Sequence, residues 1–155
     1  MNLLYDTNVV LNIIRSNNPL ILAFLNPENS NVYVSVATEA EVKSLAVRNK
    51  WGKMRLAKLE YFLERATVID INQNYINNYI EIDTYSQRIN SAFNDYPFKT
   101  PRNMGKNDLW IASLASLLNL RLVTADADFD HLNGVFIEVR KITSNDLKPF
   151  FMSNR

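Results

Sequence analysis

The segment Leu3-Leu4-Tyr5-Asp6-Thr7-Asn8-Val9-Val10-Leu11 decides how the chain folds. Its first residues are apolar and predict a short buried strand over residues 2–5, and the apolar spacing that follows predicts a helix over residues 8–15. Asp6-Thr7-Asn8 stands at the junction, and these residue types also suit the cap of a helix. A strand that leads directly into a helix is the repeating unit of parallel sheets.

The same alternation of strand and helix continues along the chain. Further strands are predicted over residues 32–35, 68–71, 120–124 and 135–139. Helices are predicted over residues 20–25, 39–49, 53–65, 75–93 and 108–119, and Ser144 is a candidate cap for a last short helix. Strands separated by helices imply a mostly parallel sheet that is covered on both faces. We therefore expect an α/β/α sandwich with four to five strands, formed by residues 1–155 as one domain.

Composition narrows the class of protein. With 155 residues, 47% of them hydrophobic, the chain can form one domain with a proper core. It has no cysteine, which excludes disulfides and thiolate metal sites and is compatible with a reducing cytoplasm. The apolar runs are far shorter than the roughly 20 residues of a membrane span. The N-terminus has no basic region of the kind that opens a secretory signal, so we expect a cytoplasmic location.

The net charge of +1 says little about partners, but the distribution of charge says more. Between Val42 and Leu59 the chain carries six basic residues and no acid. Such a stretch suits a polyanion partner, or equally a solvated helix face. The six are Lys43, Arg48, Lys50, Lys53, Arg55 and Lys58.

Four carboxylates, Asp6, Glu41, Asp108 and Asp126, each lie where a strand should end or a helix should begin. Each also has an ordinary explanation. Glu41 closes the capping-box pattern that starts at Thr38, and Asp108 stands where a helix dipole favours an acid. Asp126, like its neighbour Asp128, suits a turn.

The four acids carry more information together than they do singly. The carboxyl ends of parallel strands meet at one edge of a sheet, which is where ligands bind in open α/β folds. Carboxylates gathered there repel one another unless a cation lies between them. Ligation by oxygen alone points to Mg²⁺ or Mn²⁺.

Four segments, in order, resemble the motifs of PIN domains. They are residues 4–11, residues 35–42, Asn107-Asp108-Leu109-Trp110-Ile111-Ala112, and Leu122-Val123-Thr124-Ala125-Asp126-Ala127-Asp128-Phe129. At this length the chain is most similar to the VapC-type toxins of bacterial toxin–antitoxin pairs. One departure is that no glycine follows the second acid within Val42-Lys43-Ser44-Leu45-Ala46.

The resemblance implies a Mg²⁺-dependent endoribonuclease that hydrolyses phosphodiesters with metal-activated water and leaves 5′-phosphate and 3′-hydroxyl ends. Its metal site would be formed by Asp6, Glu41, Asp108 and Asp126. Thr124 and Asn8 would support it, and Glu39 and Asp128 are alternatives to Glu41 and Asp126. The sole histidine, His131, is expected to be a surface or packing residue.

The resemblance also implies partners. Candidate RNA contacts are Lys43, Lys50, Lys53, Arg102 and Lys106, and Trp51 and Tyr96 either stack on bases or pack in the fold. A small antitoxin would block the acidic site. A homodimer through the first helices is implied as well, with Val9, Ile13, Leu22 and Phe24 as candidate contacts.

Two other functions fit parts of the pattern. A phosphatase or phosphotransferase could use Asp6 as nucleophile, but Asn8 stands where such sites usually carry a second aspartate. A non-catalytic protein-interaction scaffold could keep the fold without binding Mg²⁺, so a metal titration would separate it from a nuclease.

Overall fold

The computed structural model describes residues 1–152, and within them five strands form one parallel sheet. The strands are β1 (Leu3–Tyr5), β2 (Val32–Ser35), β3 (Thr67–Ile69), β4 (Arg121–Thr124) and β5 (Glu138–Lys141). Their order across the sheet is β3-β2-β1-β4-β5, and all four neighbouring pairs run parallel. The α/β/α sandwich with a parallel sheet is therefore confirmed, and β1 is its central strand.

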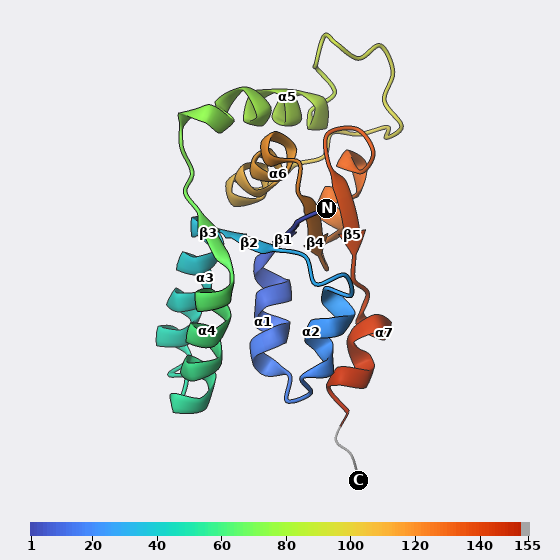
Figure 1. The fold of residues 1–155 in the computed structure, drawn as a ribbon. Coiled ribbons are helices and arrows are strands. Elements are labelled where there is room, and N and C mark those ends of the chain that lie inside the picture. The colour runs from blue at the N-terminus through green and yellow to red at the C-terminus, as the bar shows by residue number, and fades with distance from the viewer. Residues whose placement is uncertain (153–155) are drawn as a thin grey trace.

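Helices cover both faces of the sheet (Figure 1). One face carries α1 (Thr7–Arg15), α2 (Leu20–Leu25), α3 (Val36–Arg48), α4 (Lys53–Arg65) and α7 (Ser144–Leu147). The other carries α5 (Ile76–Ser86) and α6 (Lys106–Leu118). Short 3₁₀ helices form η1 (Gln73–Tyr75), η2 (Ala127–Leu132) and η3 (Lys148–Phe150). None of the helices within residues 1–152 is long and apolar enough to span a membrane.

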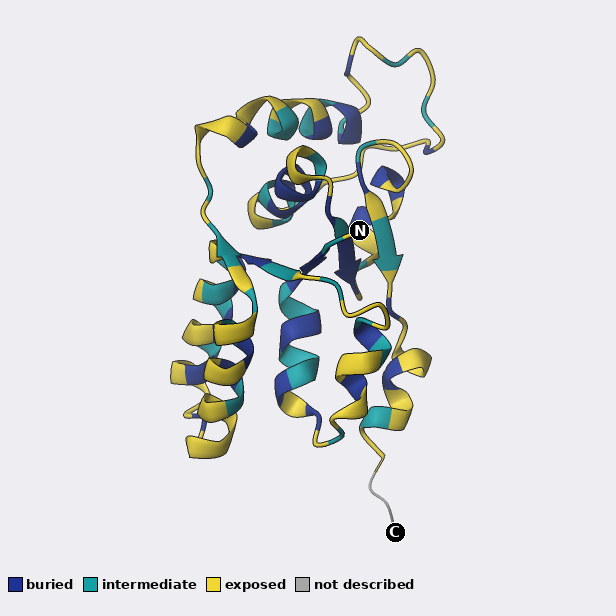
Figure 2. Cartoon of the chain, in the orientation of Figure 1, coloured by how far each residue is buried: buried dark blue, intermediate teal, exposed yellow. Residues whose placement is uncertain are grey.

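The central strand is buried on both sides because its residues alternate between two cores. Leu3 and Tyr5 join the core beneath α1, α3 and α4, whereas Leu4 joins the core beneath α5 and α6. Figure 2 shows the middle of the sheet as the most buried part of the molecule. A strand packed on both faces is held rigidly, so the residue that follows it, Asp6, has a fixed position.

One helix and one strand have bounds that differ from those predicted. The helix predicted over residues 75–93 ends at Ser86, because Arg88 takes a left-handed backbone (φ 62°) and the chain leaves as a loop. The apolar spacing continues past that point because Phe93 and Tyr96 pack around Tyr85, with ring centroids 4.6 and 5.3 Å away. The last strand was predicted over residues 135–139 but forms three residues later, as β5.

The residues proposed as dimer contacts have different surroundings. Val9 is only 2% exposed and belongs to the core, so it is no contact for a partner. Ile13 and Phe24 are half-buried, and the ring of Phe24 packs against Phe150 at 5.2 Å. Leu22 alone of the four is well exposed.

Candidate metal centre

Asp6 is the residue on which the centre is built. It follows β1 as the N-cap of α1 and is only 5% exposed. Its Oδ1 accepts the backbone N–H of Thr7 at 2.8 Å, and its Oδ2 accepts the hydroxyl of Thr124 at 2.7 Å and the amide of Asn8 at 3.3 Å. A buried carboxylate is thus held by neutral donors alone, and none of the three ion pairs within residues 1–152 includes it.

Glu41 reaches the same place from α3, the helix that follows the neighbouring strand β2. Its Oε2 accepts the hydroxyl of Thr7 at 2.9 Å, and its Oε1 accepts the side-chain amide of Asn107. Glu39, the alternative, is instead paired with Lys43 at 3.2 Å on the outer side of α3. The structure therefore brings Glu41, and not Glu39, into contact with the residue that follows Asp6.

The capping box predicted for this helix was wrong. Ser35 caps α3, because its side chain accepts the N–H of Ala37 and the helix begins at Val36 as soon as β2 ends. Thr38 consequently lies within the first turn, 2% exposed, and its hydroxyl contacts that of Thr7 at 3.2 Å. Glu41 belongs to the second turn rather than to the mouth of the helix.

Asp108 lies in the first turn of α6, as predicted. The predicted cap of this helix, Asn107, is not its cap in the structure. Gly105 occupies the cap position of the helix, and Asn107 is already its second residue. The amide of Asn107, which the sequence suggested would cap α6, instead donates to Glu41. The start of α6 is thereby tied to α3 across the centre.

Asp126 and Asp128 complete the group at the end of β4. Asp126 caps η2 by accepting the N–H of Asp128 at 2.9 Å, and its own N–H donates to the Thr124 hydroxyl at 3.0 Å. One ligand oxygen from each of Asp108, Asp126 and Asp128 lies within 4.8 Å of the others. Asp126 and Asp128, which the sequence presented as alternatives, are both brought to the same point.

The charges of these acids act on one another. Burial raises the pKa of Asp6, opposed by its hydrogen bonds from Thr124 and Thr7, while the charges of Asp126 and Glu41 raise it further. Burial also raises the pKa of Asp108 to about 6, and four neighbouring carboxylates add to the effect. The four are Asp6, Asp126, Asp128 and Glu41. We call Asp108 and these four residues together the acid cluster.

The acid cluster has the donor chemistry of a hard-cation site. All of its potential ligands are carboxylate oxygens, and the fold gives them no basic partner within residues 1–152. Mg²⁺ and Mn²⁺ prefer such oxygen ligands, and a divalent ion would relieve the mutual repulsion. The residues present therefore fit a divalent metal ion.

Two supporting residues were missed from the sequence, and two, Asn8 and Thr124, were foreseen. Asn8 was expected near the site, and its Oδ1 accepts the N–H of Ala125 at 3.1 Å while its amide donates to Asp6. Thr7 and Asn107 were missed as partners of Glu41. Thr7 stands within the Asp6-Thr7-Asn8 motif, which was the available signal, but nothing local marks Asn107.

The predicted RNA contacts are all exposed, but their partners differ. Lys43 is engaged by Glu39, and the guanidinium of Arg102 lies 5.9 Å from the ring centre of Phe98. Lys106 is the first residue of α6, two positions before Asp108. Lys50 and Lys53 lie at the turn between α3 and α4.

Three residues with alternative interpretations are packing residues. Trp51 is 7% exposed in one core, and Tyr96 packs against Tyr85 in the other. His131 is buried too, and its Nε2 lies 2.7 Å from the hydroxyl of Ser86. Burial lowers the pKa of His131 to about 4, so it is neutral at physiological pH.

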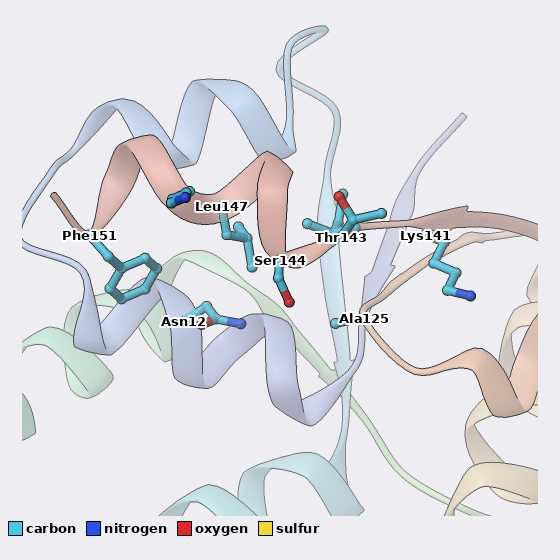
Figure 3. A pocket seen from close by; sticks show the side chains of 9 residues that line it. Asn12, Ala125, Lys141, Thr143, Ser144, Leu147 and Phe151 are labelled. Atoms are coloured by element: carbon cyan, nitrogen blue, oxygen red, sulfur yellow. The ribbon is translucent and has the colours of Figure 1, made fainter.

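Two hollows flank the acid cluster. The one along α3 has a volume of about 400 Å³ and is lined by Ala40, Glu41, Ser44, Leu45 and Arg48. The larger, about 570 Å³, lies between α1 and α7 beside the loop that carries Asp126 (Figure 3). We call it the α1–α7 hollow.

Comparison with known proteins identifies the family. Residues 3–135 match the model of the PIN domain. The chain therefore belongs to the PIN domain family, in agreement with the motifs and with the fold. No curated protein matches the chain by sequence.

Solved structures with the same fold are toxin–antitoxin complexes. VapBC2 from Rickettsia felis, bound to a DNA fragment from its promoter, has a chain with a TM-score of 0.70 and 24% identity, over 90% of this chain and 98% of that one. VapBC-1 from nontypeable Haemophilus influenzae gives a TM-score of 0.70 and 23% identity, over 91% and 98% of the two chains. VapBC-5 from Mycobacterium tuberculosis gives 0.59 and 24%, with the same coverage. At these identities the likeness is one of fold.

Proposed function

We propose that this protein is a Mg²⁺-dependent endoribonuclease and the toxin of a type II toxin–antitoxin pair. The observation that carries the proposal is the acid cluster, in which five carboxylates from four separate segments meet without a basic partner among residues 1–152. Keeping such a group together costs stability, and a bound cation would offset that cost.

The acids have separable parts in the proposed chemistry. Asp108, Asp126 and Asp128 would hold the ion, because their oxygens already lie within 4.8 Å of one another. Asp6, at the buried end of β1, would complete the site. A bound Mg²⁺ or Mn²⁺ would supply an activated water and neutralise charge on the phosphate. We expect products with 5′-phosphate and 3′-hydroxyl ends.

The neutral donors around the acids would act as positioning residues. Thr124 and Asn8 fix the carboxylate of Asp6 and connect it to the loop of Asp126. Thr7 and Asn107 hold Glu41 by one hydrogen bond to each oxygen, which orients its carboxylate toward the centre. Amide and hydroxyl donors orient a carboxylate without competing with a cation for its charge.

The proposed toxin role is supported by the solved structures that share this fold. The solved structures with this fold include VapBC complexes from three organisms and FitAB bound to a DNA fragment, which gives a TM-score of 0.65 with 19% identity over 99% of both chains. An antitoxin could silence the site by placing a basic side chain among the carboxylates. We also propose a homodimer, with Leu22 as the best exposed of the apolar residues suggested for it.

A phosphatase that uses Asp6 as nucleophile is less well supported. Asp6 is 5% exposed, and both of its oxygens accept hydrogen bonds from the protein. Asn8, in the place of the usual second acid, is held between Asp6 and Ala125. Trapping of a phosphoenzyme at Asp6 would be required to revive this function.

The decisive experiment compares RNA cleavage with metal binding. Purified protein should cleave single-stranded RNA in Mg²⁺, stop in EDTA and recover with Mn²⁺, and calorimetry should detect Mg²⁺ binding that Asp108→Asn weakens. Glu138→Gln is the matched control, because Glu138 is paired with Arg121 at 2.8 Å outside the centre. Turnover that resists EDTA would refute the mechanism, and Mg²⁺ binding without cleavage of any RNA would favour a scaffold.

A further inference from the structure

The α1–α7 hollow lies beside the loop that carries Asp126, because Ala125 lines it. Figure 3 shows Asn12 of α1 facing Ser144 and Phe151 across it, with Lys141 at the end beyond Ala125. Its volume of about 570 Å³ is within the range of sites that hold small organic groups. The residues that line it are Asn12, Ala125, Lys141, Ile142, Thr143, Ser144, Leu147, Lys148 and Phe151.

A row of amide groups joins the hollow to the acid cluster. Asn8 donates its amide to Asp6 and accepts the N–H of Ala125, which lines the hollow. One turn further along α1, the amide of Asn12 donates to the carbonyl of Asn8 at 2.9 Å. Ala125 and Asn12, which both line the hollow, are thus connected to Asp6 through Asn8.

The lining is suited to an anion that carries a flat apolar group. It contains no carboxylate and two lysines. Lys141 pairs with Asp130, but both side chains are exposed (39% and 45%), so this ion pair is easily exchanged for a phosphate. Lys148 forms no ion pair within residues 1–152, and Phe151 is 46% exposed.

These features match the way in which proteins bind unpaired nucleotides. Aromatic rings stack on bases, basic side chains contact phosphates, and amides or hydroxyls bond to base edges or to the ribose. The smaller hollow leaves the acid cluster on its other flank, from Glu41 to Arg48. The acid cluster thus lies between two hollows, each of which is lined by at least one basic side chain.

We propose that the α1–α7 hollow holds a nucleotide of single-stranded RNA next to the phosphate being cleaved, with the base against Phe151 and phosphates at Lys148 and Lys141. This inference rests on the proposed function and assigns the path of its substrate. Asn12 and Ser144 would then form hydrogen bonds to the base or the ribose. RNA would run across the acid cluster from α3 toward the C-terminal segment.

The test uses the full chain with Asp108→Asn, so that RNA is bound but not cut. A pool of short single-stranded RNA of random sequence, carrying a photoreactive base, should crosslink to the peptide that contains Phe151. Phe151→Ala should weaken RNA binding about tenfold through lost stacking. Lys148→Gln should make the salt dependence of binding shallower by about 0.7 in log–log slope.

Matched controls come from α4, which lies on the other side of α1 (Figure 1). Tyr61→Ala removes an aromatic side chain from a residue that is 54% exposed, and Arg65→Gln removes an exposed cation. Both should bind RNA like the parent. Thermal melting should show that all four variants fold, since each changed side chain is exposed.

The outcomes separate the two proposals. Parental RNA affinity in both Phe151→Ala and Lys148→Gln, with crosslinks elsewhere, would overturn the path while leaving the nuclease intact. Unchanged RNA binding combined with loss of binding to a co-expressed antitoxin would assign the hollow to a protein instead. A parent that neither binds nor cleaves RNA in Mg²⁺ would remove the proposed function itself.

Discussion

Asp6 and Asp146 both lie at the start of a helix, yet their surroundings act on them in opposite directions. Asp146 belongs to the capping box of α7, where it accepts the N–H of Thr143, and these hydrogen bonds lower its pKa. Asp6 also accepts a backbone N–H, but burial and two neighbouring acids raise its pKa. A position at the start of a helix therefore goes with a lowered pKa for Asp146 and a raised pKa for Asp6.

The contrast extends to the remaining acids. Glu39, Asp130 and Glu138 each have a lysine or arginine partner at the surface. The members of the acid cluster have only neutral donors, and they repel one another. The acid cluster has no basic partner within residues 1–152, and the cost of its mutual repulsion indicates a role in binding a positive ligand.

The largest effect expected is loss of cleavage in Asp108→Asn. Changes to residues that only support a metal ligand cost about 10–100-fold, so removal of a direct ligand should exceed about 100-fold. The metal-free variant should melt no lower than the parent, because one repelling charge is gone. RNA cleavage and thermal melting measure the two effects.

Asp146→Asn is the control for that experiment. It should lower the melting temperature by disturbing the capping box but retain far more cleavage than Asp108→Asn does, because Asp146 is fully exposed and lies outside the acid cluster. A variant at Asp146 that lost cleavage while folded would erase the distinction between the two groups of acids.

Thr124→Val should have the next largest effect. Thr124 is fully buried, and its hydroxyl donates to Asp6 and accepts the N–H of Asp126. Loss of a hydrogen bond to a buried carboxylate should lower the free energy of unfolding by about 2 kcal/mol. Cleavage should fall about tenfold, as for other changes behind a metal ligand. Thr124→Ser keeps the hydroxyl and should retain most of both properties, as measured by urea unfolding and initial rates.

The pH dependence of stability should distinguish the acid cluster from the acids that have basic partners. The pKa of Asp108 rises from its ordinary value of 3.8 to about 6, so the folded metal-free protein binds a proton that the unfolded chain releases. Stability contributed by this proton is present below pH 4 and is lost as pH rises through about 6. Asp6 acts in the same direction.

Magnesium should therefore stabilise the protein more at pH 7 than at pH 5. Binding of the ion displaces the proton, so its affinity should fall about tenfold for each pH unit below 6. Melting curves across this range, with and without Mg²⁺, measure the effect. A pH-independent gain from Mg²⁺ would mean that the ion binds elsewhere, and Asp108→Asn should flatten the profile.

The smallest effect is expected for Glu39→Gln. Its ion pair with Lys43 is exposed on α3 and should contribute less than about 0.5 kcal/mol. Cleavage should be unchanged, whereas Glu41→Gln, one half-turn away, should impair it. Equal activities of the two variants in the same assay would show that Glu41 has no part in the chemistry.

Much of the fold was predictable because local signals agreed with one another. The run of apolar residues that ends at Tyr5, followed by Asp6 as cap, fixed the central strand and its helix. The start of α3 was misplaced because Ser35 and Thr38 are both good caps, and only the end of β2 decides between them. β5 was misplaced because its position is set by pairing with β4, where Val139 aligns with Leu122.

The centre was predictable in its acids but less so in its supports. Asp6, Glu41, Asp108 and Asp126 were singled out because the sequence pattern predicted each of them after a strand or at the start of a helix in a parallel sheet, although Glu41 lies in the second turn of α3. The contact between Asn107 and Glu41 joins residues 66 positions apart, and no local pattern encodes it. Asp128 was undervalued because only the turn of η2, with its N–H bonded to Asp126, brings it back toward Asp108.

The far end of α1 also matters, although no acid lies there. The hydroxyl of Ser16 donates to the carbonyl of Phe150 at 2.7 Å, across 134 positions of sequence, and Lys58 donates to the carbonyl of Ser16. The helix that begins with the Asp6 motif is thus clamped at its other end by the last turn of the described chain. A truncation that removed Phe150 would free that end of the helix, and a defect at the tail would reach the first motif of the sequence.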